Sequence, residues 1–319
     1  MELRKTRTVK GLVSTSGFRV VVMIVLLYLV SGVMMPTYFA PSHIMQVLVL
    51  ACFLGIICIG QTFIVISGGA DLSVAYSVTL SACIFAQLTK ESGSGILGFL
   101  AAIGVAILFG AFKGFGVAVL GIPSMVMTLA TNAILMSTTY LYTGGVLKGN
   151  ATDFVTTLAK GSIFGIRWCV IVWVVLGVIA IFILRKTTFG RSVYAIGSNA
   201  QVARLSGINV VGVTIGIYIY ATVMMAIAGV LLVGYLGYPN YTMADGYQLI
   251  SIAAVVIGGT SILGGKGSYL GTMGGVVIIY LIQSILTILN IADAGKDIVN
   301  GLVILAILFA YDRSAKMRV

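Results

Sequence analysis

Long apolar runs, separated by short polar gaps, occupy the chain from residue 18 to about residue 310. A helix needs about 20 apolar residues to cross the roughly 30 Å hydrocarbon core of a bilayer. Charged residues make up only 8% of the sequence, whereas soluble domains contain about 25%. The pattern therefore predicts an all-α integral membrane protein in which residues 18–311 form one transmembrane domain of about ten helices.

The expected spans follow one another through nearly the whole chain. In order, they are 18–35, 44–66, 71–88, 96–112, 123–142, 163–184, 211–236, 247–263, 268–291 and 297–310. Residues 1–17 and 312–319 are expected to be polar cytoplasmic tails. His43, the only histidine, falls at the outer end of the second span, where we favour a surface group over a ligand or a proton relay.

Basic residues are divided unevenly between the two sides of this pattern. If the spans alternate from a cytoplasmic N-terminus, fourteen of the 19 lysines and arginines lie on the inner side. The five on the outer side are Lys90, Lys148, Lys160, Arg167 and Lys296. Positive charge is enriched on the cytoplasmic side of membrane proteins, so both termini are expected there. This placement accounts for the net charge of +11 without nucleic acid, which we do not expect as a partner.

No acid lies near the middle of an expected span, which argues against a proton- or sodium-driven carrier. Asp71, Asp293 and Asp297 fall at span ends, and Lys113 falls at the inner end of the fourth span. For Asp71 we favour a role as N-cap of the third span, with Ser73 beside it, and keep a direct substrate contact as the alternative.

No group of residues indicates catalysis or metal binding. The cysteines lie inside apolar runs without the spacing of metal ligands and are interpreted as packing residues: Cys52, Cys58, Cys83 and Cys169. No acid/base, metal or nucleophile cluster supports a membrane enzyme. We therefore expect no catalytic residue, metal or cofactor in this chain.

The longest polar interruption is 185–210. It contains four basic residues and no acid: Arg185, Lys186, Arg191 and Arg204. Ser198 or Asn199 can cap a short helix over 200–206, which Gly207 can end in the left-handed conformation. Because two helical turns are not stable alone in water, this helix is predicted to be a docking element.

A glycine-rich stretch, 258–271, contains six glycines in fourteen residues. It lacks the G-x-x-x-x-G-K-[ST] order of a phosphate-binding loop, so ATP is expected to bind to a separate partner. The stretch 257–262 repeats the pattern Ile-Gly-x-Thr-x-Ile of 59–64, which indicates a possible weak internal repeat. Candidate pathway or packing residues in the two regions are Gln61, Thr62, Gly68, Gly69, Asp71, Ser73, Gly258, Gly259, Thr260, Gly264, Gly265 and Gly267.

Three segments carry a resemblance to a known family: GQTFIVISGGADLSV (60–74), YAIGSNAQVARLSGINV (194–210) and ISIAAVVIGGTSILGGKGSYLGT (250–272). They are similar to the membrane permeases of ribose-type sugar ABC importers, in matching order over nearly the whole chain. Where that family usually has glycine after the DLSV motif, this chain has Ala75 and Tyr76.

The resemblance implies a permease that pairs as a homo- or heterodimer and works with a separate ATPase and an extracytoplasmic sugar-binding protein in a bacterial inner membrane. It places a cytoplasmic coupling helix at Gly197, Asn199, Ala203, Leu205 and Gly207, and Arg204 lies within the same segment. The small side chain of Ala203 is expected to permit close docking of the ATPase.

Sequence and resemblance together predict an ATP-driven importer that moves a sugar or sugar-like solute by alternating access. A stand-alone channel or an ion-coupled carrier is the alternative. The spans offer hydroxyls and amides but no central charge, which favours a neutral cargo. These polar residues are Gln61, Thr62, Ser81, Thr128, Thr131, Asn132 and Ser284.

Overall fold

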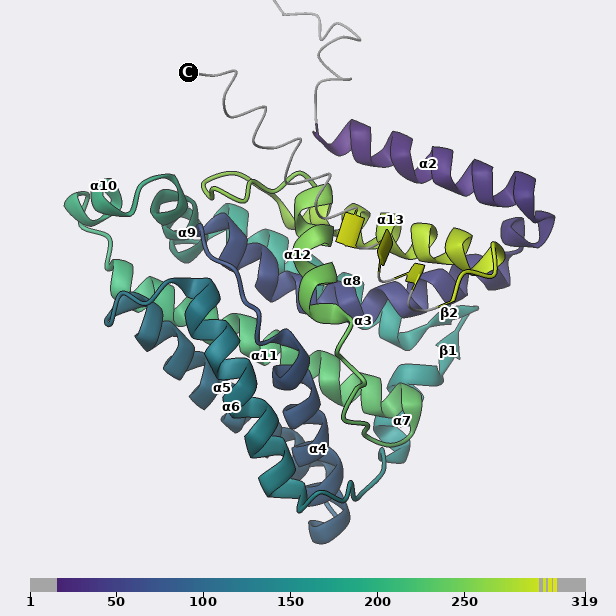
Figure 1. Ribbon diagram of the computed structural model, residues 1–319, viewed down its shortest axis with the longest axis horizontal. Helices are drawn as coiled ribbons and strands as arrows, with labels where there is room; N and C mark the ends of the chain where they lie inside the picture. The colour runs from purple at the N-terminus through teal and green to yellow at the C-terminus, as the bar shows by residue number, and fades with distance from the viewer. Residues whose placement is uncertain (1–15, 293–294, 297, 300, 303–319) are drawn as a thin grey trace, which may run out of the picture.

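The computed structural model describes residues 16–292, 295–296, 298–299 and 301–302. Within these residues, the chain is a helical bundle with one small two-stranded sheet (Figure 1), which confirms the predicted all-α class. The elements are α2 (Ser16–Met34), η1 (Pro36–Phe39), α3 (Pro41–Ile66), α4 (Val74–Ser92), α5 (Gly95–Ala118), α6 (Ser124–Thr143), α7 (Asp153–Lys160), β1 (Ser162–Ile163), β2 (Ile166–Arg167), α8 (Trp168–Lys186), α9 (Thr188–Ser198), α10 (Ala200–Leu205), α11 (Val210–Leu236), α12 (Tyr247–Ile257) and α13 (Tyr269–Ile288).

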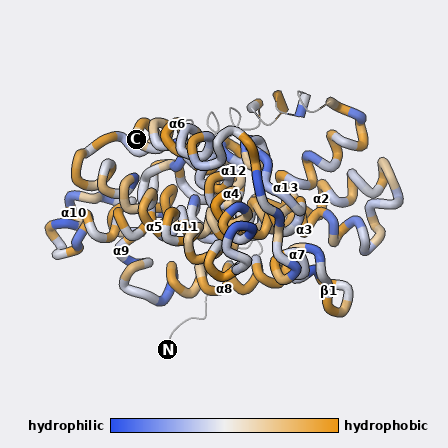
Figure 2. Tube along the Cα trace, turned by 90° about the horizontal axis from the view of Figure 1, so that it is seen from below, coloured by the Kyte–Doolittle hydropathy of each residue, from blue (hydrophilic) through white to orange (hydrophobic). Residues whose placement is uncertain are grey.

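Five of the described helices are long and apolar enough to cross a membrane: α3, α5, α8, α11 and α13. Helices α2, α4 and α6 have 19, 19 and 20 residues. Hydrophobic residues follow most of the helical trace in Figure 2. The expected C-terminal tail and most of the expected tenth span lie outside the described residues, and α2 begins at Ser16, two residues before the expected first span.

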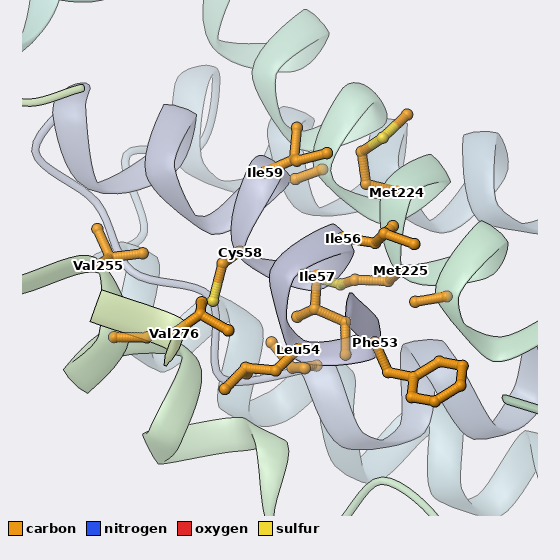
Figure 3. Close-up of a cluster of buried hydrophobic side chains, with 14 of the residues drawn as sticks. Phe53, Leu54, Ile56, Ile57, Cys58, Ile59, Met224, Met225, Val255 and Val276 are labelled. Atoms are coloured by element: carbon orange, nitrogen blue, oxygen red, sulfur yellow. The ribbon is translucent and has the colours of Figure 1, made fainter. Parts of the chain in front are cut away.

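Helix α3 is the central element of the bundle. Every residue from Ala51 to Ile66 is buried, as expected for a helix that is apolar all round. It contacts α8, α11, α12 and α13, and Figure 3 shows its side chains packed with Met224 and Met225 of α11, Val255 of α12 and Val276 of α13.

Glycines bring helix backbones together in this core. A Cβ atom added at Gly110 or Gly114 of α5 would lie 2.6 Å from the Cα of Ile219 or Ile215 of α11. A Cβ atom at Gly60 would strike the backbone of Ala221. The small residues thus allow the close helix approach that replaces the hydrophobic driving force inside a membrane.

The segment between α6 and α8 is more ordered than the loop expected there. Thr152 accepts a hydrogen bond from the Val155 N–H and starts α7. Strands β1 and β2 then pair antiparallel around Phe164 and Gly165, both at positive φ. The expected sixth span, 163–184, was therefore placed too early, because this hairpin occupies its first residues and α8 begins at Trp168.

Helix α12 is shorter than the span expected at 247–263. It ends at Ile257 after 11 residues, about 16 Å at 1.5 Å per residue, which cannot cross roughly 30 Å of hydrocarbon. Gly258 and Gly259 end it, the latter at φ +89°. The two stretches of the possible internal repeat therefore differ in conformation, since 59–64 is helical whereas 258–262 is not.

Candidate functional site

The predicted docking helix is present as α10. The Asn199 side chain accepts hydrogen bonds from the N–H groups of Gln201 and Val202, at 2.9 and 3.0 Å, and Gly207 adopts φ +80°. Both features of the sequence prediction are confirmed. Helices α9 and α10 lie at the left of Figure 1, far from the β1–β2 hairpin.

Sequence reasoning missed α9, which precedes the docking helix. Thr187 accepts a hydrogen bond from the Gly190 N–H and caps it, and Val193 and Ile196 form its buried face. The capping threonine and the three-residue apolar spacing are the signals that could have revealed it.

Ala203 does not face outward as expected. It is only 3% exposed, and α10 packs against α9 and α11. The outward apolar residues of α10 are Val202 and Leu205, which are 56% and 85% exposed. Correcting the sequence interpretation, these two side chains and not Ala203 are available to a docked partner.

Gly68, Gly197, Gly264 and Gly265 form a glycine junction at the C-terminal end of α3. The Gly265 N–H donates to the Ile66 carbonyl oxygen at 2.8 Å. A Cβ atom at Gly197 would strike that carbonyl and lie 2.6 Å from the Gly265 nitrogen, and one at Gly264 would lie 2.7 Å from the Gly197 oxygen. Backbone therefore contacts backbone where α9, α3 and the glycine-rich turn meet.

Tyr194 connects α9 to the glycine-rich turn by a hydrogen bond. Its hydroxyl donates to the Gly267 carbonyl oxygen at 2.8 Å. Burial raises the pKa of the Tyr194 phenol, and Arg185 opposes this shift. The raised pKa keeps the hydroxyl protonated, as its role of hydrogen-bond donor requires.

The remaining glycine-rich candidates pack α12 against α13. A Cβ atom at Gly258 would lie 2.5 Å from the Gly271 carbonyl. Gly267, at φ +158°, would bring a Cβ atom to 2.5 Å from the buried Thr260. These residues form a tight crossing, and among them Gly259 supplies a turn at positive φ.

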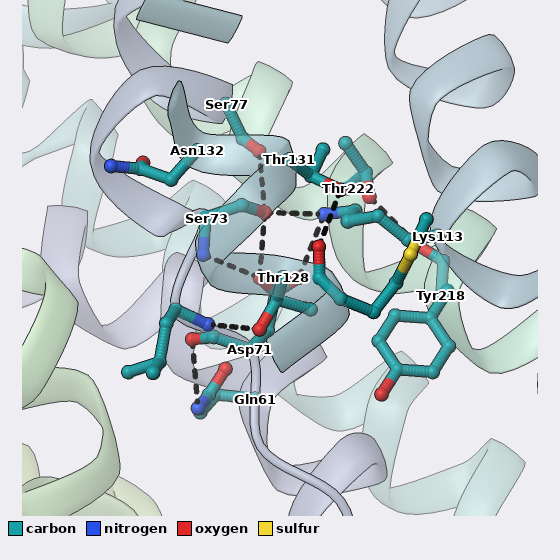
Figure 4. Close-up of polar contacts among 12 residues, drawn as sticks. Gln61, Asp71, Ser73, Ser77, Lys113, Thr128, Thr131, Asn132, Tyr218 and Thr222 are labelled. Carbon is teal, nitrogen blue, oxygen red and sulfur yellow. Dashed lines mark hydrogen bonds and ion pairs between the residues drawn. The ribbon is translucent and has the colours of Figure 1, made fainter. Parts of the chain in front are cut away.

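Asp71 belongs to a buried ion pair that sequence reasoning missed (Figure 4). Its carboxylate lies 2.7 Å from the Lys113 ammonium, and both side chains are 0% exposed. The other carboxylate oxygen accepts from the N–H and hydroxyl of Ser73 at 2.7 and 2.6 Å. Lys113 also donates to the Ser73 hydroxyl at 2.8 Å.

Two sequence interpretations are corrected by this pair. Asp71 is not the N-cap of α4, since Ser73 occupies that position and gives no side-chain cap bond. Lys113 is not an anchor at the inner surface, because α5 continues to Ala118 and buries it. Neither charge lies near the middle of a span, as expected, but both are buried within the bundle. The two side chains are paired with each other and hydrogen-bonded to Ser73, which offsets the cost of burying them.

The pair holds a non-helical segment, 67–73, inside the bundle. Residues of α6 satisfy its backbone: Ser124 accepts from the Ala70 N–H at 3.2 Å, and Thr128 accepts from the Leu72 N–H at 2.9 Å. Irregular backbone within a membrane protein must be satisfied by protein in this way. Thr128 is a sequence candidate for the passage only because it has a hydroxyl. In the structure, this hydroxyl satisfies the backbone of the non-helical segment.

The candidate pathway residues of α3 are enclosed. Gln61 and Thr62 are 0% exposed. The Gln61 amide donates to the Asp71 carbonyl at 3.4 Å, and the Thr62 hydroxyl donates to the Cys58 carbonyl at 2.6 Å and bonds Thr272 at 3.0 Å. In this conformation both residues hold segments together and line no open passage.

A cavity of about 660 Å³ with a mixed polar and apolar lining opens at the opposite end of α3. It lies between the N-terminal ends of α3 and α12 and the C-terminal end of α13. His43, expected at the surface, is half-buried here, its ring centroid 3.8 Å from that of Tyr38. Ser284, another candidate hydroxyl, donates to Tyr38 at 3.0 Å and lies 3.4 Å from His43.

Comparison with known proteins gives a consistent picture. Residues 43–308 match the family model described as Branched-chain amino acid transport system / permease component. The ribose import permease protein RbsC of Bacillus subtilis is 32% identical over 293 residues, which are 91% of each chain. The inner membrane ABC transporter permease protein YjfF of Escherichia coli is 36% identical over 271 residues, 82% of this chain and 80% of the relative. No solved structure matches the chain.

Proposed function

Because the chain belongs to the permease family described as Branched-chain amino acid transport system / permease component, we propose that it is the membrane-spanning subunit of an ATP-driven importer for a neutral, sugar-like solute. The sugar assignment draws on relatives named as ribose import permeases. ATP binds to a separate ATPase subunit. A second permease chain and an extracytoplasmic sugar-binding protein complete the importer.

The glycine junction is the observation that carries this proposal. Val202 and Leu205 of α10 present apolar side chains outward, where the cleft of an ATPase can receive them. Gly197 of α9 contacts the end of α3 through backbone atoms. Because close-packed backbone transmits displacement with little compression, movement of α9–α10 passes directly into the central helix and drives alternating access.

Orientation is part of the proposal. The basic residues of 185–210 put α9 and α10 on the cytoplasmic side, and both termini lie there. When the buried Lys113 is left out of the count, basic residues are still more numerous on the inner side than on the outer side. Reporters active on only one side of the membrane, fused at Val319 and inserted near Asn150, test this. A C-terminal reporter active outside would contradict it.

The variant Leu205→Arg tests the coupling role of α10, and the measurement is recruitment of the ATPase by the assembled importer. A charged side chain at this position should lower recruitment of the ATPase to membranes by about tenfold or more, since a buried apolar anchor carries much of an interface's affinity. Phe164→Arg, at the 99% exposed tip of the β1–β2 hairpin, is the matched control. Unchanged recruitment by Leu205→Arg would show that α10 is not the coupling element.

The alternative functions are a stand-alone channel and an ion-coupled carrier. The Asp71–Lys113 pair offers a charge to such a carrier, but its complete burial and its hydrogen bonds with Ser73 favour a structural role. Uptake that persists after removal of every ATPase subunit would favour these alternatives over the importer.

A further inference from the structure

We infer that the cavity of mixed lining at the N-terminal end of α3 is a binding site for a neutral polyhydroxy solute on its way into the membrane domain. This inference rests on the proposed function, since it names where the solute of that importer first contacts the permease. It concerns Gln46, Gln283, Tyr247 and Tyr280, none of which entered the sequence analysis as a candidate.

The lining has the chemistry that recognises hydroxyl groups. Gln46 and Gln283 supply amides, which can donate and accept at once. Within the part of the chain that the structure describes, neither amide makes a hydrogen bond to another residue. Both therefore remain available to a ligand that offers donors and acceptors close together, as a sugar does.

Aromatic rings supply the apolar half of the site. Tyr38, Tyr247 and Tyr280 line the cavity together with the aliphatic Val47, Leu50 and Ile250. Sugars present C–H faces as well as hydroxyls, and rings with a polar tip serve both. At about 660 Å³ the volume lies within the ordinary range of small-molecule sites, about 300–1,000 Å³.

Part of the site is held in place before a ligand arrives. The Tyr38 hydroxyl donates to the Ser284 carbonyl at 3.1 Å, while the Ser284 hydroxyl donates to the Tyr38 hydroxyl at 3.0 Å. The Tyr28 hydroxyl donates to the Tyr38 carbonyl at 2.7 Å. This network ties η1 to α13, so the cavity wall does not have to be ordered by the solute.

The charged residues around the cavity favour a neutral solute over an anion. No Asp or Glu occurs among the described residues that line the cavity, and Lys296 is the one charged side chain among them. Lys296 interacts with another group of the protein. A carboxylate or phosphate would therefore bury its charge opposite a single cation that is already engaged, which is costly.

The cavity is also connected to the coupling end. It is built from α3, α12 and α13, and the opposite ends of α3 and α12 and the start of α13 flank the glycine junction. A solute bound here contacts the helices that coupling movements would displace.

Cysteine protection tests the inference in the full chain, reconstituted with its ATPase but without ATP. The four native cysteines are buried, so Gln46→Cys and Gln283→Cys provide labelling sites over a low background. Gln248→Cys, beside the lining residue Tyr247 but outside the cavity, is the matched control. The probes are D-ribose and D-glucose, compared with ribose 5-phosphate and gluconate, and the measurement is the rate of maleimide labelling.

With a neutral sugar at about ten times its Kd, labelling at Gln46→Cys and Gln283→Cys should slow by about tenfold, while Gln248→Cys is unaffected. Absence of protection by either neutral sugar would overturn the inference. Protection by only the charged compounds would assign the cavity to an anion paired with Lys296 and equally overturn it. Because no ATP is used, protection without ATP-driven uptake would instead contradict the proposed importer and leave the site intact.

Discussion

At its C-terminal end, α3 meets α9 and the glycine-rich turn through backbone atoms, whereas at its N-terminal end it meets α12 and α13 across an open cavity. The helix between the two ends has 26 residues, about 39 Å along its axis. One end has no room for a single added methyl group at Gly197. The other leaves about 660 Å³ open.

This difference separates two mechanical requirements of a transporter. A junction that transmits force needs close packing, because voids absorb displacement. A site that receives a solute needs open volume and polar groups that are still unpaired. Substitutions should therefore affect stability strongly around the junction and weakly around the cavity.

The largest expected effect comes from Lys113→Met, next to the junction end. It removes one partner of a fully buried ion pair and leaves the Asp71 charge uncompensated, which should lower the free energy of unfolding by about 3–5 kcal/mol. A denaturing-detergent titration followed by tryptophan fluorescence measures it. The double variant Asp71→Asn, Lys113→Met should recover much of the loss. A single variant as stable as wild type would mean that the pair does not hold 67–73.

Gly197→Ala should have the next largest effect. The added methyl group strikes the Ile66 carbonyl and the Gly265 nitrogen, both backbone atoms that cannot rotate away, so we expect a loss of about 3 kcal/mol and of ATP-driven uptake. Gly104→Ala is the control, because nothing lies within 4 Å of its added Cβ. Normal uptake by Gly197→Ala would contradict transmission through this contact.

Tyr269→Phe tests the middle of α3, between the two ends. The Tyr269 hydroxyl accepts from the Trp173 indole at 2.7 Å and donates to the Gly55 carbonyl at 2.9 Å. Its removal leaves the buried Trp173 N–H unpaired and the Gly55 carbonyl with only its bond within α3, which should cost about 1–3 kcal/mol in the same titration. Tyr238→Phe, 61% exposed, should change nothing. Equal stability of both variants would show that this network does not stabilise the bundle.

Most of the long apolar helices and the helix α10 could be predicted because their signals are local. Apolar length fixes a span, and Asn199 and Gly207 fix the ends of α10 through their own backbone neighbours. The Asp71–Lys113 pair could not be predicted, since its partners are 42 residues apart and meet only when α5 packs against the segment preceding α4. The burial of Ala203 could not be predicted for the same reason, because it depends on how α10 packs against α9 and α11.

The cavity could not be predicted from the sequence either, because its lining residues come from four separate segments. Gln46, Tyr247 and Gln283 look like ordinary polar residues at helix ends. Only the open volume between the helices distinguishes them from Gln248, which directly follows Tyr247 but does not line the cavity.

The smallest effect on stability should come from Gln283→Leu, at the open end. The side-chain amide makes no hydrogen bond within the described part of the chain, so its loss should change the free energy of unfolding by less than about 0.5 kcal/mol. Transport should nevertheless change, since an amide that contacts the solute is lost. Uptake by the assembled importer, with Gln248→Leu as control, measures this. A variant that loses stability as severely as Lys113→Met would mean that this end is packed like the other, and the contrast between the two ends of α3 would fail.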